Sequence, residues 1–355
     1  MKALTISAHG GFDQLEFRDD LPMPEIRKPG AVRIKIAAGA LNHLDLFVVK
    51  GLPGLTIVPP WILGCDATGV VESVGANVKN VRPGDRVVIN PGLSCHECEY
   101  CNAGEHSLCV KFSLMGEHRP GVFAEYAVLP ARNVRGIPNG ISDAQAAAFT
   151  LATITAWRML VTRAQVKAGE QVLIQGIGGG VALAALQIAK LKGARVWVTS
   201  SSDEKLAKAA ALGADETLNY RNVDVAREIR GRTGKRGVDV VVDSVGVATW
   251  SQSLGALGKG GRLVSCGATT GPMVETDMRR MFWNHWTLMG STMGNEAEFE
   301  AIVAELSVGR LVPPVDSVFP LAEGRRAFER MAAGAQFGKI VLSIGANAPE
   351  RVSVP

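Results

Sequence analysis

The chain has 355 residues, of which 47% are hydrophobic and 20% are charged, and its formal net charge is +4. This length predicts about two domains with full cores, and the scattered basic residues argue against a nucleic-acid partner. The apolar run at the N-terminus is too short for a signal peptide, and no run of about twenty apolar residues predicts a membrane span. We therefore expect a soluble, cytoplasmic protein.

About the first 145 residues are predicted to be rich in β-strands. Short strand-like runs, separated by glycine and proline, occur at Ala31–Ile36, Gly69–Val74 and Asp85–Ile89. The stretch from Val32 to Leu41 lacks clean alternation, as expected of a strand that is buried on both faces.

From about residue 150, strands alternate with helices, which predicts an α/β fold with a parallel sheet covered on both faces. The six predicted strands, which match a complete dinucleotide-binding domain, are Gln171–Gln175, Arg195–Thr199, Glu216–Asn219, Val238–Val242, Arg262–Cys266 and Leu288–Ser291. The predicted helices between them are Val181–Leu191, Glu204–Leu212, Val225–Thr233 and one near Trp250–Leu257. The chain closes with predicted helices Glu296–Ser307 and Glu323–Ala333 and the strand Lys339–Ser343. We expect residues 346–355 to form a loose tail.

Four cysteines lie close together in the sequence, at Cys95, Cys98, Cys101 and Cys109. Two consecutive C-x-x-C steps, with a fourth cysteine after one short loop, can place four thiolates around a tetrahedral zinc ion. The alternative is a disulfide framework, which is typical of small secreted chains rather than of a chain of this length. Because four thiolates leave no open position for water or substrate, we expect one structural zinc per chain.

A glycine-rich loop leads from the first strand of the alternating region into its helix. It contains Gly176, Gly178, Gly179 and Gly180, followed by Val181. A tight turn there lets the backbone approach a pyrophosphate, and the free amides and dipole of the helix favour the phosphate charges. An ordinary turn is the alternative, but the position between a strand and a helix favours a dinucleotide.

The end of the second strand in this region bears on the choice between the nicotinamide cofactors. An acidic residue there would bond the ribose of NAD, whereas this chain has Ser200 and Ser201, followed by Lys205. The absence of a carboxylate removes repulsion of the 2′-phosphate of NADPH, and the lysine attracts this phosphate. Tyr220 could close on the same phosphate. In the alternative, the serines cap a helix, the lysine is solvated and Asp203 contacts the ribose. We expect NADPH rather than NADH.

Together these features resemble the medium-chain dehydrogenase/reductase superfamily, in its zinc alcohol dehydrogenase and quinone oxidoreductase group. The resemblance covers nearly the whole chain, and its further motifs are Pro83–Val87, Gly121–Tyr126, Ala185–Lys190, Leu212–Asp215 and Gly338–Leu342. It implies a GroES-like catalytic domain from residues 1–148 and 294–355, with a zinc lobe at 92–112, and a Rossmann domain at 149–293. It also implies an active site in the cleft and a homodimer, or a tetramer, that pairs the last Rossmann strand near Gly290–Thr292. Further cofactor contacts are implied at Gly246, Gly267, Ser291 and Lys339.

Zinc alcohol dehydrogenases hold a second, reactive zinc with a cysteine, a histidine beside a glutamate, and another cysteine. By the resemblance these positions fall on Asn42, on Cys65 next to Asp66, and on Leu151. Two of the three ligands are therefore missing, and the histidine is replaced by a cysteine. Only Cys65, Asp66 and a displaced His43 could hold this zinc, which needs three protein ligands.

Asn42 together with Asp45 instead resembles the zinc-independent quinone oxidoreductases, and Thr155 matches a threonine that packs against the nicotinamide in the family. Without a Lewis acid, a simple ketone loses the group that polarises its carbonyl. Quinones and α,β-unsaturated carbonyls are then favoured as the small-molecule substrate. Their developing charge needs hydrogen-bond donors, for which Asn42, His43 and Thr155 are the candidates, with His43 as the best proton donor.

Other interpretations of these residues and of the chain stay open. His43 could contact the cofactor pyrophosphate, Cys65 could be a small buried residue, and Asp66 could be a structural acceptor. The protein could also be a zinc-dependent alcohol dehydrogenase rebuilt around Cys65 and Asp66, or a relative that binds NADPH without catalysis.

Overall fold

The structure is a computed structural model that describes residues 1–345. These residues form two compact units, one of Met1–Ala152 with the chain from Gly294 onward, and one of Thr153–Met293. The tail predicted at residues 346–355 lies outside the described residues. Within residues 1–345, no helix has both the length and the apolar character needed to cross a lipid bilayer.

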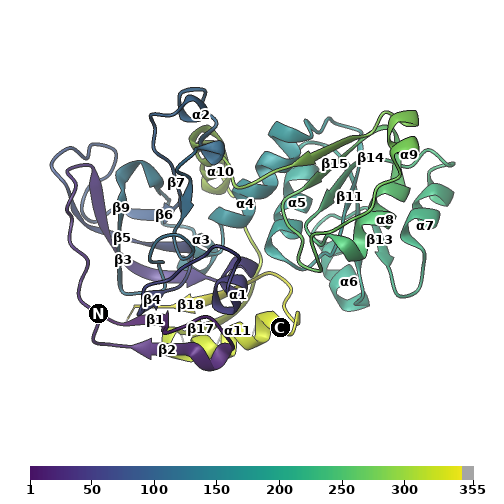
Figure 1. The fold of residues 1–355 in the computed structure, drawn as a ribbon. Coiled ribbons are helices and arrows are strands. Elements are labelled where there is room, and N and C mark those ends of the chain that lie inside the picture. Colours follow the sequence, from purple (N-terminus) through teal and green to yellow (C-terminus); the bar gives the residue numbers. More distant parts are fainter. Residues whose placement is uncertain (346–355) are drawn as a thin grey trace. The chain divides into compact units, whose positions relative to one another are not determined.

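The first unit is built around a seven-stranded sheet that contains strands from both ends of the chain (Figure 1). Its strands are β3 (Ala31–Ala40), β5 (Asp66–Val74), β6 (Arg86–Ile89), β9 (Tyr126–Pro130), β10 (Val134–Gly136), β17 (Val315–Pro320) and β18 (Lys339–Ser343). The order is β10-β6-β5-β3-β18-β17, with β9 also paired to β3. All pairs are antiparallel except β17 with β18. The long central strand β3 is buried along most of its length, as its sequence pattern predicts.

A small sheet and several helices complete the first unit. The small sheet has the order β2-β1-β4 and consists of β1 (Ala3–Ile6), β2 (Leu15–Arg18) and β4 (Trp61–Ile62). The helices are α1 (His43–Lys50), α3 (Asp143–Ala147), α10 (Glu296–Ser307) and α11 (Gly324–Ala332), and α4 (Thr150–Trp157) spans the boundary to the second unit. Figure 1 shows α11 beside β17 and β18, which it contacts. Apolar side chains from β1, β3 and α11 share one core, which includes Leu4, Ile34 and Phe328.

The four cysteines lie in a lobe inserted between β6 and β9. A two-stranded sheet of β7 (Gly92–Leu93) and β8 (Ser113–Leu114) forms its base. The short helix α2 (Glu99–Asn102) and a 3-10 turn at His106–Leu108 lie between these strands. The beginning of α10 reaches this lobe, and Figure 1 shows α10 next to α2.

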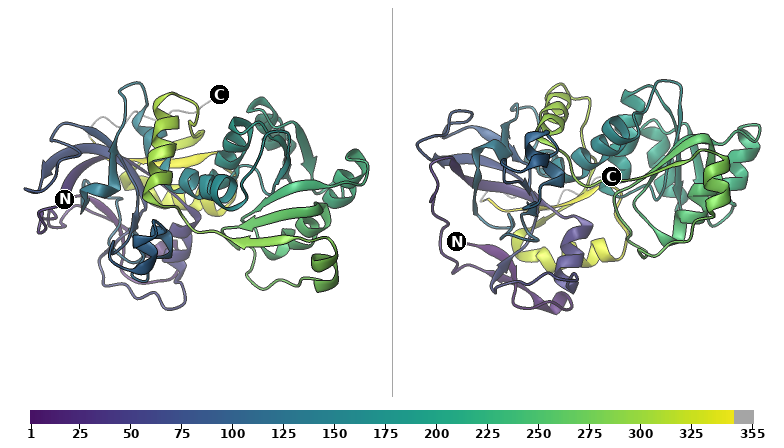
Figure 2. Two further views of the ribbon diagram at one scale, coloured as in Figure 1. Left: turned by 90° about the horizontal axis from the view of Figure 1, so that it is seen from above. Right: turned by 45° about the horizontal axis from the view of Figure 1, so that its top comes forward.

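The second unit is a six-stranded, fully parallel sheet with helices on both faces (Figure 2). Its strands are β11 (Gln171–Ile174), β12 (Arg195–Ser200), β13 (Glu216–Asn219), β14 (Val238–Asp243), β15 (Leu257–Ser265) and β16 (Thr287–Gly290). Its helices are α5 (Gly180–Leu191), α6 (Asp203–Ala211), α7 (Val225–Arg232), α8 (Val247–Ala256) and α9 (Met278–Trp283), with a π-helical stretch at Arg158–Arg163 after α4. The strand order β13-β12-β11-β14-β15-β16 reverses between β11 and β14, which is the Rossmann topology. The predicted fold class is confirmed.

Most predicted elements of the second unit differ from the observed ones by only one or two residues. The largest difference is β15, which begins at Leu257 rather than at Arg262. Its first residues pair with β14 across a register irregularity between Val238 and Val240. The elements that the sequence pattern does not predict include β1, β17, α1 and α3 in the first unit and α9 in the second.

Close backbone contacts hold the segment that leads from β4 into β5. Gly121 donates its N–H to the carbonyl of Ile62 at 2.8 Å, and Phe123 donates to the carbonyl of Leu63 at 2.9 Å. A Cβ on Gly121 would lie 2.2 Å from the carbonyl oxygen of Leu63. Only glycine fits there, because the obstructing atoms belong to the backbone and cannot rotate away.

Gly121→Ala should therefore destabilise the first unit. We expect a loss of about 1–3 kcal/mol in the free energy of unfolding, measured by urea denaturation, because the neighbouring backbone must shift. Gly30→Ala is the matched control, since nothing lies within 4 Å of a Cβ at that position; its change should stay within about 0.5 kcal/mol. Equal stability of the two variants would contradict the packing described.

Candidate functional site

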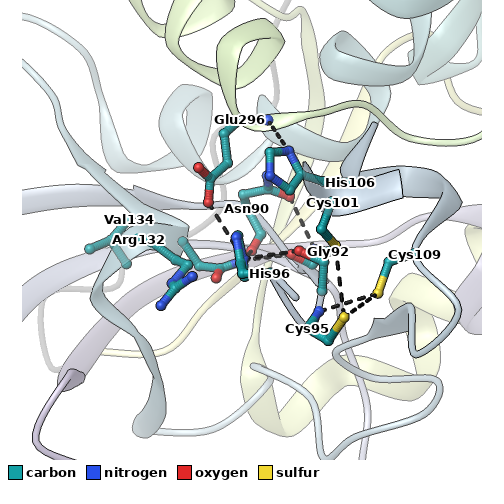
Figure 3. A network of polar contacts seen from close by, with 12 residues as sticks. Asn90, Gly92, Cys95, His96, Cys101, His106, Cys109, Arg132, Val134 and Glu296 are labelled. Atoms are coloured by element: carbon teal, nitrogen blue, oxygen red, sulfur yellow. Dashed lines mark hydrogen bonds and ion pairs between the residues drawn. The ribbon is translucent and has the colours of Figure 1, made fainter. Parts of the chain in front are cut away.

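The four predicted zinc ligands converge on one point in the lobe, and Figure 3 shows three of them. The Sγ atoms of Cys95, Cys98, Cys101 and Cys109 all lie within 4.8 Å of one another. The Sγ of Cys95 is 3.4 Å from that of Cys109 and 3.9 Å from that of Cys101. Thiolates bound to tetrahedral zinc at about 2.3 Å lie about 3.8 Å apart. All six cysteines are free of disulfides, so the donor set fits a structural zinc.

Backbone N–H groups donate hydrogen bonds to the Sγ atoms of Cys98 and Cys109. The N–H groups of Cys95 and Lys111 donate to the Sγ of Cys109 at 3.2 and 3.3 Å. Backbone N–H groups of Cys101 and Val110 lower the pKa of Cys98 to about 6. Burial instead raises the pKa of Cys101 to about 11. Because zinc binds thiolates, zinc binding would release the protons that remain on the cysteines.

The glycine loop between β11 and α5 fits a pyrophosphate. Gly176 and Gly178 have φ angles of 69° and 127°, in the region that favours glycine. Gly179 is the N-cap of α5, no side chain caps this end of the helix, and a Cβ at Gly179 would meet nothing within 4 Å. Gly180 and Val181 form the first turn, whose backbone amides have no partner within the helix and can bind a phosphate.

The end of β12 carries no carboxylate. Ser200 is buried, and its Oγ accepts the N–H of Ser202 at 3.2 Å. Ser202, not Ser200 or Ser201, caps α6, because its Oγ accepts the N–H of Lys205 at 3.3 Å. The carboxylate of Asp203 accepts a hydrogen bond of 2.7 Å from Asn219. The capping alternative therefore accounts for one of the three serines.

The other predicted cofactor contacts of the second unit follow the carboxyl ends of parallel strands. Gly246, with a φ of 91°, follows β14, Gly267 follows β15 and Ser291 follows β16. Carboxyl ends of parallel strands meet at one edge of the sheet, the edge that binds ligands in this topology. Ser291 donates its N–H to Ser265 at 2.9 Å, whereas its buried Oγ has no partner among residues 1–345. Such a group fits a hydrogen bond to a bound cofactor. Tyr220, after β13, is exposed.

In the first unit, three predicted site residues form a buried polar cluster. The Nζ of Lys339 donates to the Oδ1 of Asn42 at 2.5 Å and to the Oδ2 of Asp66 at 3.1 Å. The Nδ2 of Asn42 donates to the same Oδ2 at 3.0 Å, and the N–H of Leu151 donates to Oδ1 of Asp66 at 2.7 Å. The side chains of Lys339 and Asp66 are 4% and 0% exposed. The ion pair is thus removed from water, and both oxygens of its carboxylate accept hydrogen bonds.

Strand register brings this cluster together. Ala40 of β3 pairs with Asp66 of β5 on one side and with Val341 of β18 on the other. Asn42 follows β3 directly as the N-cap of α1. We expected Lys339 to contact the cofactor; the structure instead buries its ammonium group between Asn42 and Asp66.

The donors that a rebuilt catalytic zinc would need are already bonded. The thiol of Cys65 donates to the carbonyl of Met115 at 2.9 Å. Burial, followed by the nearby carboxylates of Asp45 and Asp66, raises the pKa of this thiol well above its ordinary value. Within residues 1–345, two groups of metal-ligating side chains have all their ligand atoms within 4.8 Å, and neither includes Cys65, Asp66 or His43. These residues do not fit a second zinc.

The remaining predicted catalytic residues differ in their available hydrogen-bond donors, their pKa values and their burial. Both amide hydrogens of Asn42 are engaged, by Asp66 and more weakly by the carbonyl of Ala40 at 3.4 Å, so no donor is left for a substrate. Asp45 accepts the N–H of Asn42 at 2.7 Å, and burial raises its pKa to about 7. His43 is exposed at the start of α1; desolvation by surrounding atoms and the charge of Lys339 lower its pKa. Thr155 is buried in α4 of the second unit.

The structure also contains a cluster that the sequence pattern does not predict. His96, His106 and Glu296 bring three ligand atoms within 4.8 Å of one another (Figure 3). The available signal is the position of both histidines between the cysteines of the lobe. Glu296 follows almost two hundred residues later, and only the fold reveals its proximity.

Comparison with known proteins identifies the family to which the chain belongs. Residues 28–139 match the alcohol dehydrogenase GroES-like domain, and residues 180–308 match the zinc-binding dehydrogenase family. A zinc-type alcohol dehydrogenase-like protein of Schizosaccharomyces pombe is 35% identical over 94% of this chain and 96% of its own length. The quinone oxidoreductase of Homo sapiens is 29% identical, over 96% of this chain and 97% of its own.

A solved structure, described as an NAD-dependent alcohol dehydrogenase, has 43% sequence identity and a TM-score of 0.93, and covers 97% of this chain and 100% of its own. This similarity extends over both units, and it agrees with the GroES-like and Rossmann sheets and with the cysteine lobe. The family implies a nicotinamide cofactor and zinc. The chain is therefore an oxidoreductase of the medium-chain dehydrogenase/reductase superfamily, in its group of zinc-type alcohol dehydrogenases and quinone oxidoreductases.

Proposed function

We propose that this protein is an NADPH-dependent reductase of quinones or α,β-unsaturated carbonyls, with a structural zinc in the lobe and no catalytic zinc. One observation carries the proposal. Both oxygens of the Asp66 carboxylate are bonded, to Leu151, Asn42 and Lys339, so this carboxylate is not free to bind a metal. The thiol of Cys65 is buried and bonded to a carbonyl.

The substrate class follows from the missing Lewis acid. The nicotinamide cofactor supplies the hydride when it is bound. Reduction of a simple ketone without zinc places the full developing charge on one oxygen. A quinone or an enone spreads that charge to a remote oxygen, which hydrogen-bond donors of the protein can stabilise.

His43 is the donor that the first unit offers. Its imidazole lies at the N-terminus of α1, where desolvation by surrounding atoms and the nearby ammonium of Lys339 disfavour the protonated form and lower its pKa. The lowered pKa keeps His43 neutral near pH 7, as a donor through its ring N–H. Asn42 is a positioning residue in this account, since its amide holds Lys339 and Asp66 in place. Thr155 is the proposed donor from the second unit; its hydroxyl donates to the Sδ of Met293 at 3.9 Å, a weak bond that a substrate oxygen would replace.

A substrate screen combined with metal analysis tests this proposal. Tag-free protein should oxidise NADPH with quinones or enones faster than it oxidises alcohols with NADP. Cys65→Ala should keep both the bound zinc and most of the activity, whereas Cys98→Ser should lose zinc, because that residue belongs to the lobe.

Two results would reject the proposal. One is alcohol oxidation that disappears together with one bound metal ion in Cys65→Ala, which would indicate the rebuilt zinc enzyme. The other is NADPH binding without turnover of any quinone, enone or aldehyde, which would indicate a non-catalytic relative. The alcohol dehydrogenases among the similar proteins make the first of these the second candidate function.

The buried ion pair can be tested through stability. Lys339→Met should lower the free energy of unfolding by about 3–5 kcal/mol, because it leaves the buried carboxylate of Asp66 without an opposite charge. Adding Asp66→Asn should recover part of this loss. Lys190→Met breaks the partly exposed pair with Asp215 and should change the free energy by about 0–1 kcal/mol. A similar effect of both lysine variants in urea denaturation would show that the Lys339 charge is not buried.

NADPH is favoured over NADH by the end of β12. Ser200 stands there without a carboxylate that would repel a 2′-phosphate, and Lys205 lies in the first turn of α6. Asp203, the residue that could bond a ribose instead, is held by Asn219. The similar protein described as NAD-dependent points the other way, so the two cofactors have to be compared directly.

Lys205→Ala should weaken NADPH binding by about tenfold and leave NADH binding nearly unchanged, because it removes a charge-assisted contact to the phosphate. Fluorescence titration of both nucleotides measures this. Lys208→Ala is the control, since Lys208 is on the same helix, farther from the end of β12, and pairs with Glu204. A wild-type protein that binds NADH more tightly, or equal losses for both nucleotides, would refute the assignment.

We also propose a homodimer. Among residues 1–345, β16 is an edge strand of the parallel sheet and pairs with β15 alone. Phe282 and Trp283, on the helix before it, are 64% and 74% exposed. Exposed aromatic side chains beside an open edge favour pairing with a second copy of the chain. A tetramer would join two such dimers.

A further inference from the structure

We propose that His96, His106 and Glu296 form a second metal site, which takes a borderline divalent cation of the zinc, cobalt and nickel group. Ligand atoms of the three side chains all lie within 4.8 Å of one another. Figure 3 shows the two imidazoles and the carboxylate facing one another beside the cysteines. The proposal does not depend on the reaction that the enzyme catalyses.

The distances are close to those of a bound cation. The Nε2 of His96 is 3.6 Å from the Oε1 of Glu296, and the two imidazole rings are 5.0 Å apart between centroids. Nitrogen and oxygen ligands about 2.0–2.2 Å from zinc lie about 3.4 Å apart in a tetrahedron. The Nε2 of His96 and the carboxylate are therefore already close to the required separation, and the other ligand atoms need to approach by at most about 1.4 Å.

The zinc lobe fixes the backbone of both histidines. His96 follows Cys95 directly, and His106 lies three residues before Cys109, so a zinc ion at the cysteines holds both segments. His96 has a φ of 60°, a conformation that is uncommon for residues other than glycine and is often found at functional sites. These constraints keep both rings next to the start of α10.

The carboxylate of Glu296 is not needed to cap its own helix. Asn295 is the N-cap of α10, and its side chain accepts the N–H of Glu298 while the carboxylate of Glu298 accepts the N–H of Asn295. Glu296, the first residue of the helix, can therefore point its carboxylate toward His96.

Three interactions of the two histidines compete with a bound cation. The Nδ1 of His106 is 3.4 Å from the N–H nitrogen of Glu296, at the long end of a hydrogen bond. Ser94 lies 3.0 Å from the Nε2 of His96. The positive charge of Arg132 acts on His96 and opposes a bound cation.

Two imidazoles and one carboxylate suit zinc, cobalt or nickel, whereas magnesium and calcium prefer oxygen ligands alone. A bound cation would link the lobe to α10 through Glu296.

The test uses tag-free, full-length protein with zinc already bound at the four cysteines. Titration with Co²⁺ should add one equivalent per chain, with visible d–d bands and without the charge-transfer band that a thiolate ligand gives. His96→Asn and Glu296→Gln should each weaken this binding by at least about tenfold. His285→Asn is the matched control, because His285 has a similar φ of 54° and lies outside the cluster.

Arg132→Gln gives an independent test, since it keeps all three ligands and removes the opposing charge; it should bind Co²⁺ more tightly. Zinc content and circular dichroism equal to the wild type report that each variant is folded. The proposal is overturned if the wild type binds no additional Co²⁺ up to millimolar concentration, or if the ligand variants bind it as tightly as the His285→Asn control.

Discussion

An ammonium group inside a protein has to be paired, and the pairing of Lys339 with Asp66 constrains the whole first unit. Both side chains are buried, and an unpaired charge in this position would cost several kcal/mol. Lys339 belongs to β18 and Asp66 to β5, so the pair forms only when both strands align on β3. The two ends of the chain must therefore come together before either charge can leave water.

The hydrogen bonds around this ion pair determine which groups are available to a metal or a substrate. Asp66 is occupied by three donors and Asn42 has no spare hydrogen, which leaves neither available to a metal or a substrate. His43, one residue after Asn42, is exposed and carries a lowered pKa. In this account the buried cluster positions α1 and His43, and metal binding is confined to the lobe and to its contact with Glu296 of α10. The family includes both zinc-type alcohol dehydrogenases and quinone oxidoreductases, and the cluster favours the second kind of site.

Local patterns predict much of the molecule. Alternating strands and helices, the four clustered cysteines and the glycine loop are visible in the sequence because each feature spans few residues. Long-range features are not visible in the sequence. Lys339 and Asp66 are 273 positions apart, and nothing near either residue indicates that the lysine is buried. β17 is partly buried along its length without clear alternation, and the first residues of β15 include three glycines, which favour a loop over a strand. Glu296 joins the two histidines of the lobe only through the fold.

The most direct test of this account is zinc-edge X-ray absorption on tag-free protein that carries His106→Ala, which removes the site proposed beside the lobe. Zinc in this variant should have only sulfur neighbours, at about 2.3 Å, as expected for the four cysteines. A shell of nitrogen or oxygen neighbours at about 2.0–2.2 Å would place zinc outside the lobe and contradict a zinc-free catalytic site.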